Sequence, residues 1–92
     1  MIELGGNIRL VNFESLEPAL LIVIKKIVGN YTKKLSETLK EFKSIELSLN
    51  EENQITVTVE ADKKYVSEAK DKNLFFALNA ALQQILNHVL LS

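Results

Sequence analysis

The last third of the chain carries an apolar stripe that needs a packed partner to bury it. When residues 71–88 are placed on a helical wheel at about 100° per residue, the large apolar side chains gather on one side. Asp71 or Asn73 can cap the first turn, because a short side-chain oxygen there accepts an unpaired backbone N–H. The stripe consists of Leu74, Leu78, Ala81, Leu82, Ile85 and Val89. We therefore expect a helix whose apolar face is covered by the segments that precede it.

Those segments read as strands. In residues 45–49 and 55–60 apolar and polar side chains alternate, which is typical of strands with one buried face. Residues 50–53 have the length of a hairpin turn, and residues 64–69 show a weaker alternation after a second turn at 61–63. We expect a three-stranded meander followed by the helix.

The first half of the chain predicts a strand and a long helix. Residues 2–13 read as an extended segment in which Gly5 and Gly6 predict a bulge or bend. Pro18 suits the first turn of a helix, and this helix is expected to run to about Phe42. Its apolar side is formed by Ile24, Val28, Tyr31, Leu35, Leu39 and Phe42. The expected fold is one α+β domain over residues 1–92, with the order β-α-β-β-β-α and both helices on one face of an antiparallel sheet.

The amino-acid composition limits which classes of protein this chain can belong to. The 92 residues are 47% apolar and 25% charged, which fits one compact domain, and there is no cysteine for a disulfide or a thiolate metal site. The N-terminal residues do not resemble a signal peptide, and the longest apolar run, 19–24, is too short to span a bilayer. We expect a cytoplasmic protein with no membrane partner.

Lysines give the clearest functional signal. From Glu17 to Lys43 six lysines and three glutamates give +3, and five basic and nine acidic residues elsewhere give −4, which together make the net charge of −1. Four of the six lysines form a row along one side of the predicted helix. A row of lysines can contact successive phosphates of a nucleic acid. Alternatively the row is a solvated helix face, because Glu37 and Glu41 lie within ion-pair range. The row comprises Lys26, Lys33, Lys34 and Lys40.

Several apolar residues do not fit the expected core. The first turns of the long helix, including Ile22 and Val23, are apolar all round, and Phe76 lies opposite Leu78 on the last helix. An exposed aromatic is a candidate anchor for a partner or a homodimer. Alternatively Phe76 is covered by the N-terminal segment or by the tail at Leu90. The candidate interface is Ile22, Val23, Phe76 and Leu90.

No residue pattern predicts catalysis. His88 has no identifiable orienting partner, and Glu51 and Glu52 fit a hairpin turn better than a metal site. Gly5 and Gly6 lack the third glycine and the following helix of a dinucleotide-binding loop. We expect no enzyme activity, no metal and no cofactor. A small ligand held between sheet and helices stays a remote alternative.

The residues 73–79, Asn-Leu-Phe-Phe-Ala-Leu-Asn, resemble a motif of the ribosome hibernation-promoting factors (ribosome-associated translation inhibitors), with Asn at two Asp positions and Phe at a Tyr position. The opening Ile2–Ile8 resembles that family's first strand and glycine. The N-terminal domain of this family has the same element order. The resemblance implies binding of the small ribosomal subunit, in the channel for messenger and transfer RNA, through lysines of the helical face.

Two functions therefore compete. The first is a non-catalytic binding domain for ribosomal or other structured RNA, which acts sterically through the lysines of the first helix. The second is a self-associating protein-interaction module with no nucleic-acid role.

Overall fold

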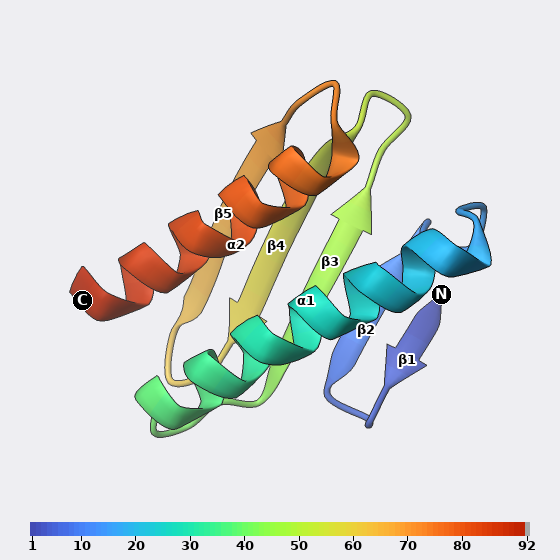
Figure 1. The fold of residues 1–92 in the computed structure, drawn as a ribbon. Coiled ribbons are helices and arrows are strands. Elements are labelled where there is room, and N and C mark those ends of the chain that lie inside the picture. Colours follow the sequence, from blue (N-terminus) through green and yellow to red (C-terminus); the bar gives the residue numbers. More distant parts are fainter. Residues whose placement is uncertain (92) are drawn as a thin grey trace.

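The computed structural model describes residues 1–91. It has the expected α+β architecture with the order β-α-β-β-β-α, in which the first strand is folded back on itself as a hairpin (Figure 1). The elements are β1 (Ile2–Leu4), β2 (Ile8–Val11), α1 (Pro18–Thr38), β3 (Ser44–Leu49), β4 (Gln54–Glu60), β5 (Lys64–Lys70) and α2 (Leu74–Leu91).

The strands form one sheet in the order β1-β2-β3-β4-β5. Neighbouring strands are antiparallel except β2 and β3, which are parallel because α1 carries the chain over the sheet between them. The register places Leu10 beside Leu47 and Leu47 beside Val57. Since side chains alternate along a strand, this register puts the apolar residues of successive strands on one face.

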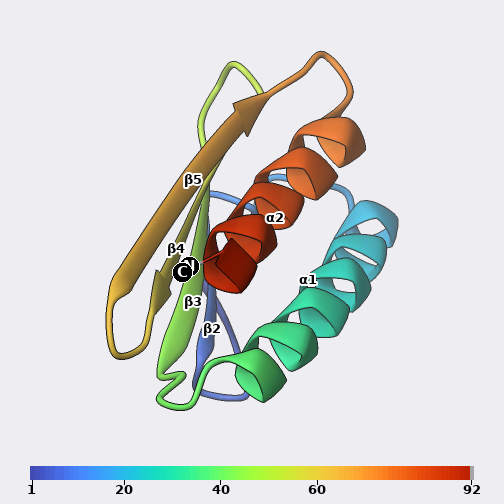
Figure 2. The same cartoon turned by 90° about the vertical axis from the view of Figure 1, so that its left-hand side faces the viewer.

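Both helices cover that apolar face, and the opposite face of the sheet is left uncovered (Figures 1 and 2). α2 crosses β4 and β5, and α1 lies beside it over β2 and β3 (Figure 1). The core between the layers contains Phe13, Ile24, Leu47, Val57 and Leu82, all fully buried. The hairpin alternation and the two helical stripes therefore meet in a single core, as the sequence pattern predicts.

The N-terminal segment differs from the expectation of one interrupted strand. Gly5 and Gly6 have φ angles of 61° and 79°, a backbone region that L-residues with a side chain avoid. They form the turn between β1 and β2 instead of a bulge within one strand. The sheet consequently gains a fifth strand.

The prediction that the first helix reaches about Phe42 was wrong by four residues. α1 ends at Thr38, and Leu39 is extended with ψ 125°. Leu39 is buried in the core, and the backbone N–H of Lys43 donates to the carbonyl of Glu60. The chain leaves the helix early because it must turn into β3 beside β4.

Asn73 caps α2, as its position predicts. Its Oδ1 accepts hydrogen bonds from the backbone N–H groups of Phe75 at 2.9 Å and Phe76 at 3.3 Å. Further along, the Ser67 hydroxyl of β5 donates to the carbonyl of Ala81 at 2.7 Å. The cap and this buried bond fix how α2 lies across the sheet.

By length and composition α2 could cross a membrane. Core helices of soluble proteins meet the same criterion, and 33% of this helix is buried inside the structure. Its high hydropathy comes partly from the side chains that pack on the sheet, such as Leu78, Leu82 and Ile85.

Candidate binding surface on the helical layer

Three of the four predicted lysines lie on the outer side of α1. Residues Ile24, Val28 and Leu35 hold the helix on the sheet, and this leaves Lys26, Lys33 and Lys34 exposed. Lys26 and Lys33 are seven residues apart, which is two turns or about 10.5 Å along the helix. The core packing of α1 therefore turns the lysines toward solvent.

These lysines make no ion pair within 4.0 Å with a carboxylate of the described residues. Within residues 1–91 the ion pairs closer than 4.0 Å join the N-terminal amine to Glu14 and Lys70 to Glu52. Glu37 and Glu41 are near the lysines in sequence, but they take part in neither of these two ion pairs. The neighbouring helix α2 contains no Asp or Glu at all. The outer surface of α1 therefore carries these lysines together with one exposed carboxylate, Glu37, that is not paired with them within 4.0 Å among the described residues.

Lys34 has a further contact within the helix. Its Nζ lies 5.4 Å from the centre of the Tyr31 ring, a distance that allows a cation–π interaction. The Tyr31 hydroxyl in turn donates to Oε1 of Gln83 on α2 at 3.2 Å. Lys34 is thus positioned beside the boundary between the two helices.

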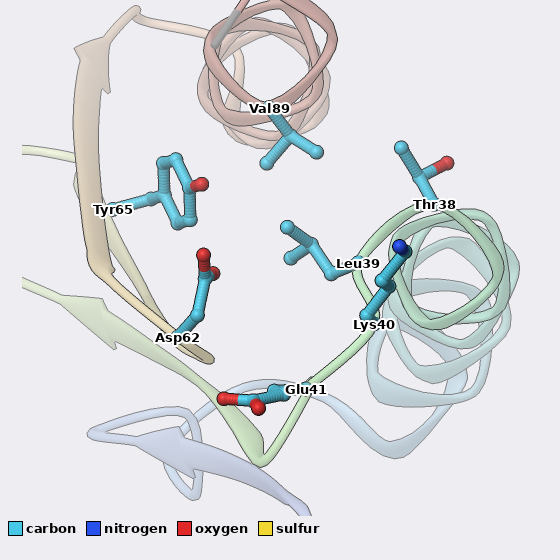
Figure 3. Close-up of a pocket in the computed structure, with 7 residues that line it drawn as sticks. All are labelled: Thr38, Leu39, Lys40, Glu41, Asp62, Tyr65 and Val89. Atoms are coloured by element: carbon cyan, nitrogen blue, oxygen red, sulfur yellow. The ribbon is translucent and has the colours of Figure 1, made fainter.

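Lys40 does not lie on the helix, because α1 ends at Thr38. It is exposed in the following loop and lines an open depression of about 300 Å³ between the end of α1, the β4–β5 turn and the end of α2 (Figure 3). Leu39 and Val89 approach each other in its middle, and Asp62 and Tyr65 lie on the opposite side from Lys40 (Figure 3). Lys40 is therefore beyond the helical row that its sequence spacing predicted.

The four predicted interface residues are all exposed. The exposed fractions are 68% for Ile22, 45% for Val23, 64% for Phe76 and 60% for Leu90. Neither the N-terminal segment nor the tail of α2 covers Phe76, which was the alternative for that residue. The helical layer thus combines exposed lysines on α1 with exposed apolar side chains on both helices.

The Tyr31–Gln83 bond shows which of these residues are near one another. α1 and α2 run in the same direction (Figure 1), so residues equally far before Tyr31 and Gln83 lie at similar levels. Val23 is eight residues before Tyr31 and Phe76 seven before Gln83, which is about 12 and 10.5 Å at 1.5 Å per residue. Val23 and Phe76 therefore lie at the same end of the helical layer, and Leu90 lies at the other.

The described residues contain no evident catalytic or metal-binding constellation. Within residues 1–91 no group of three or more His, Asp or Glu side chains could hold a metal ion. His88 is exposed on α2. Two further depressions, of about 410 and 150 Å³, lie beside the β3–β4 turn and on the uncovered face of the sheet.

The outer face of α2 carries no Asp, Glu, Lys or Arg, a feature that the residues predicted to form a site do not include. Leu74–Leu91 contains no Asp, Glu, Lys or Arg. Its exposed side chains include the amides of Asn79, Gln83 and Asn87. In the sequence, a stretch of 18 residues without Asp, Glu, Lys or Arg indicates this uncharged face. The chain matches no protein-family model and no curated protein sequence.

Proposed function

We propose that the protein is a non-catalytic, cytoplasmic binding domain whose lysines on α1 contact the phosphates of structured RNA, with ribosomal RNA as the first candidate. The observation that supports it is the exposure of Lys26, Lys33 and Lys34 without an ion pair within 4.0 Å among the described residues. Exposed cations attract polyanions by releasing their counterions. Lys40 lies beyond the helix, in a depression that Glu41 and Asp62 also line. The resemblance of residues 73–79 to the hibernation-promoting factors points to the same partner.

The mechanism of this proposal is steric. A rigid domain held by lysine–phosphate contacts occupies a channel or groove on the RNA and excludes other ligands. Such contacts do not read base sequence, so affinity depends on phosphate geometry and falls as salt rises.

A salt titration tests the proposal. Binding of isolated small ribosomal subunits, and of a short RNA duplex, is measured by sedimentation or fluorescence between about 50 and 200 mM salt. Four phosphate contacts on a duplex predict a slope of log K against log salt of about −3.6. The variant with Lys26, Lys33 and Lys34 changed to Gln should lose most of the affinity and flatten the slope.

A matched variant controls for total charge. Lys63, Lys64 and Lys72 changed to Gln remove the same three charges outside α1 and should bind nearly as well as the parent. Equal losses in both variants, or no binding by the parent at low salt, would overturn the proposal.

A second candidate function is self-association, and a separate observation supports it. Ile22, Val23, Phe76 and Leu90 leave more apolar surface on one layer than solubility alone favours. In this candidate the helical layer docks a second copy of the chain and binds no nucleic acid. Sedimentation equilibrium of the parent over a range of concentrations tests it, and a monomer throughout would remove it.

A further inference from the structure

The outer side of α2 contains a regular seam. Phe76, Ala80, Gln83, Asn87 and Leu90 follow each other at steps of four, three, four and three residues, and all five are exposed. The positions have the 3.5-residue spacing of a coiled-coil contact, but large apolar side chains occupy only its two ends, Phe76 and Leu90. The side chains that hold α2 on its own sheet, such as Leu78 and Ile85, lie on the opposite side.

We propose that this seam is the contact surface for α2 of a second copy, and that the two helices pack in parallel. The inference rests on the second candidate function, self-association, and names the surface and the orientation. It leaves the lysines of α1 outside the contact.

The chemistry of the seam matches itself. Phe76 and Leu90 at its ends provide apolar contacts, and Ala80 is small enough for the helices to approach closely. Gln83 and Asn87 lie between them, where the Gln83 side-chain amide donates to Oδ1 of Asn87 at 3.1 Å. Each amide has both donors and acceptors, so the same residue on a second copy can complete the hydrogen bonds. No ionised Asp, Glu, Lys or Arg side chain of α2 has to lose water in this contact.

The lysines on α1 select the parallel orientation. If the two α2 helices were antiparallel, the two-fold axis would be perpendicular to them and would stack α1 on α1, with Lys26, Lys33 and Lys34 of both copies opposed. If they are parallel, the axis runs along the helices and each α1 lies on the opposite side of the seam from the other. Like charges in an interface are costly, so the parallel dimer is favoured. An amide such as Asn87 in the seam also fixes register in parallel helix pairs.

Single cysteines test both surface and orientation, because the chain has no cysteine of its own. In a parallel pair Ala80 lies opposite Ala80 of the second copy, at a distance that permits a disulfide. The Ala80→Cys variant should therefore form a disulfide-linked dimer under mild oxidation. Asn30→Cys is the control on α1: it is exposed and adjacent to Tyr31, so it would meet its own copy only in the antiparallel arrangement.

Charge substitutions test the same surface without oxidation. In sedimentation equilibrium Ala80→Glu should weaken dimerisation by roughly tenfold or more, because two like charges meet at the seam. His88→Glu places the same charge on α2 outside the seam and should leave the dimer intact. Circular dichroism of both variants checks that the helices are retained.

The outcomes separate the inference from the function on which it rests. Cross-linking through Ala80→Cys but not Asn30→Cys, together with loss of the dimer in Ala80→Glu, supports the parallel seam. A parent dimer that Ala80→Glu leaves intact, or one cross-linked through Asn30→Cys, overturns the seam while self-association stands. A parent that is monomeric at all concentrations overturns both.

Discussion

Asn73 shows at the residue scale how one side chain starts a helix. Its Oδ1 accepts two backbone N–H groups of the first turn of α2. We predict that Asn73→Ala lowers the free energy of unfolding by about 1 kcal/mol, since a helix cap typically contributes this much. Chemical denaturation measures the change. Asn79→Ala is the matched control: among the described residues Asn79 donates to the carbonyl of Phe75 in its own helix, so an equal loss there would contradict the capping role.

At Thr32 a buried hydroxyl that is unpaired among the described residues lowers the stability of the fold. Thr32 is buried on α1, and its hydroxyl has no hydrogen-bond partner among the described residues. Thr32→Val keeps the shape and removes the unpaired hydroxyl, so we predict that the free energy of unfolding rises by about 1 kcal/mol.

Thr38→Val controls for the change of residue type. The hydroxyl of Thr38 donates to the carbonyl of Lys34 at 2.8 Å and is exposed, so this variant should not be stabilised. A decrease in stability for Thr32→Val would mean that the hydroxyl is satisfied in solution.

At the scale of elements, Lys70 links β5 to the β3–β4 turn. Its Nζ lies 2.6 Å from the carboxylate of Glu52, and the hydrogen bond, with the attraction of the opposite charge, lowers the pKa of Glu52. A lowered carboxyl pKa means that the pair stabilises the fold above the ordinary Glu pKa and loses this effect as the pH falls through the lowered value. Both side chains are largely exposed, so the pair contributes little to stability.

A titration of Glu52 followed by NMR checks this pair. We predict that its pKa lies below that of an isolated glutamate in the parent and rises toward it in Lys70→Gln. The Lys63→Gln variant should leave it unchanged. A Glu52 pKa that does not respond to Lys70→Gln would show that the pair is not populated in solution.

The sequence predicts elements better than their ends. Alternation in residues 45–49 and 55–60 is local, and it correctly gives β3, β4 and their buried face. The end of α1 depends on the route that the chain must take from Thr38 into β3, which local periodicity does not contain. The hairpin of β1 and β2 had a local signal in Gly5 and Gly6, whose positive φ angles suit a tight turn.

The candidate surface was only partly predictable for a similar reason. Helical spacing places Lys26 and Lys33 on the polar side of α1. Whether Glu37 neutralises them depends on side-chain conformations, and the structure has no ion pair there among the described residues. Lys40 left the row because the helix ended before it.

For the whole molecule, the two layers present surfaces with different chemistry. The helical layer has lysines on α1 and an uncharged seam on α2, whereas the uncovered face of the sheet carries charges of both signs, such as Arg9, Glu46 and Glu60. A parallel dimer through α2 leaves α1 of each copy exposed on opposite sides. The proposed dimer would therefore leave the proposed RNA-contacting lysines accessible, unlike a dimer that covers the whole helical layer.

The most direct test of the account is to locate RNA on the folded domain by NMR. The isotope-labelled protein is titrated with a short RNA duplex at low salt, and backbone amide shifts are followed. We expect shifts concentrated around Lys26, Lys33, Lys34 and Lys40, which disappear as salt is raised. Shifts concentrated on the uncovered face of the sheet around Arg9, or no shifts at low salt, would contradict it.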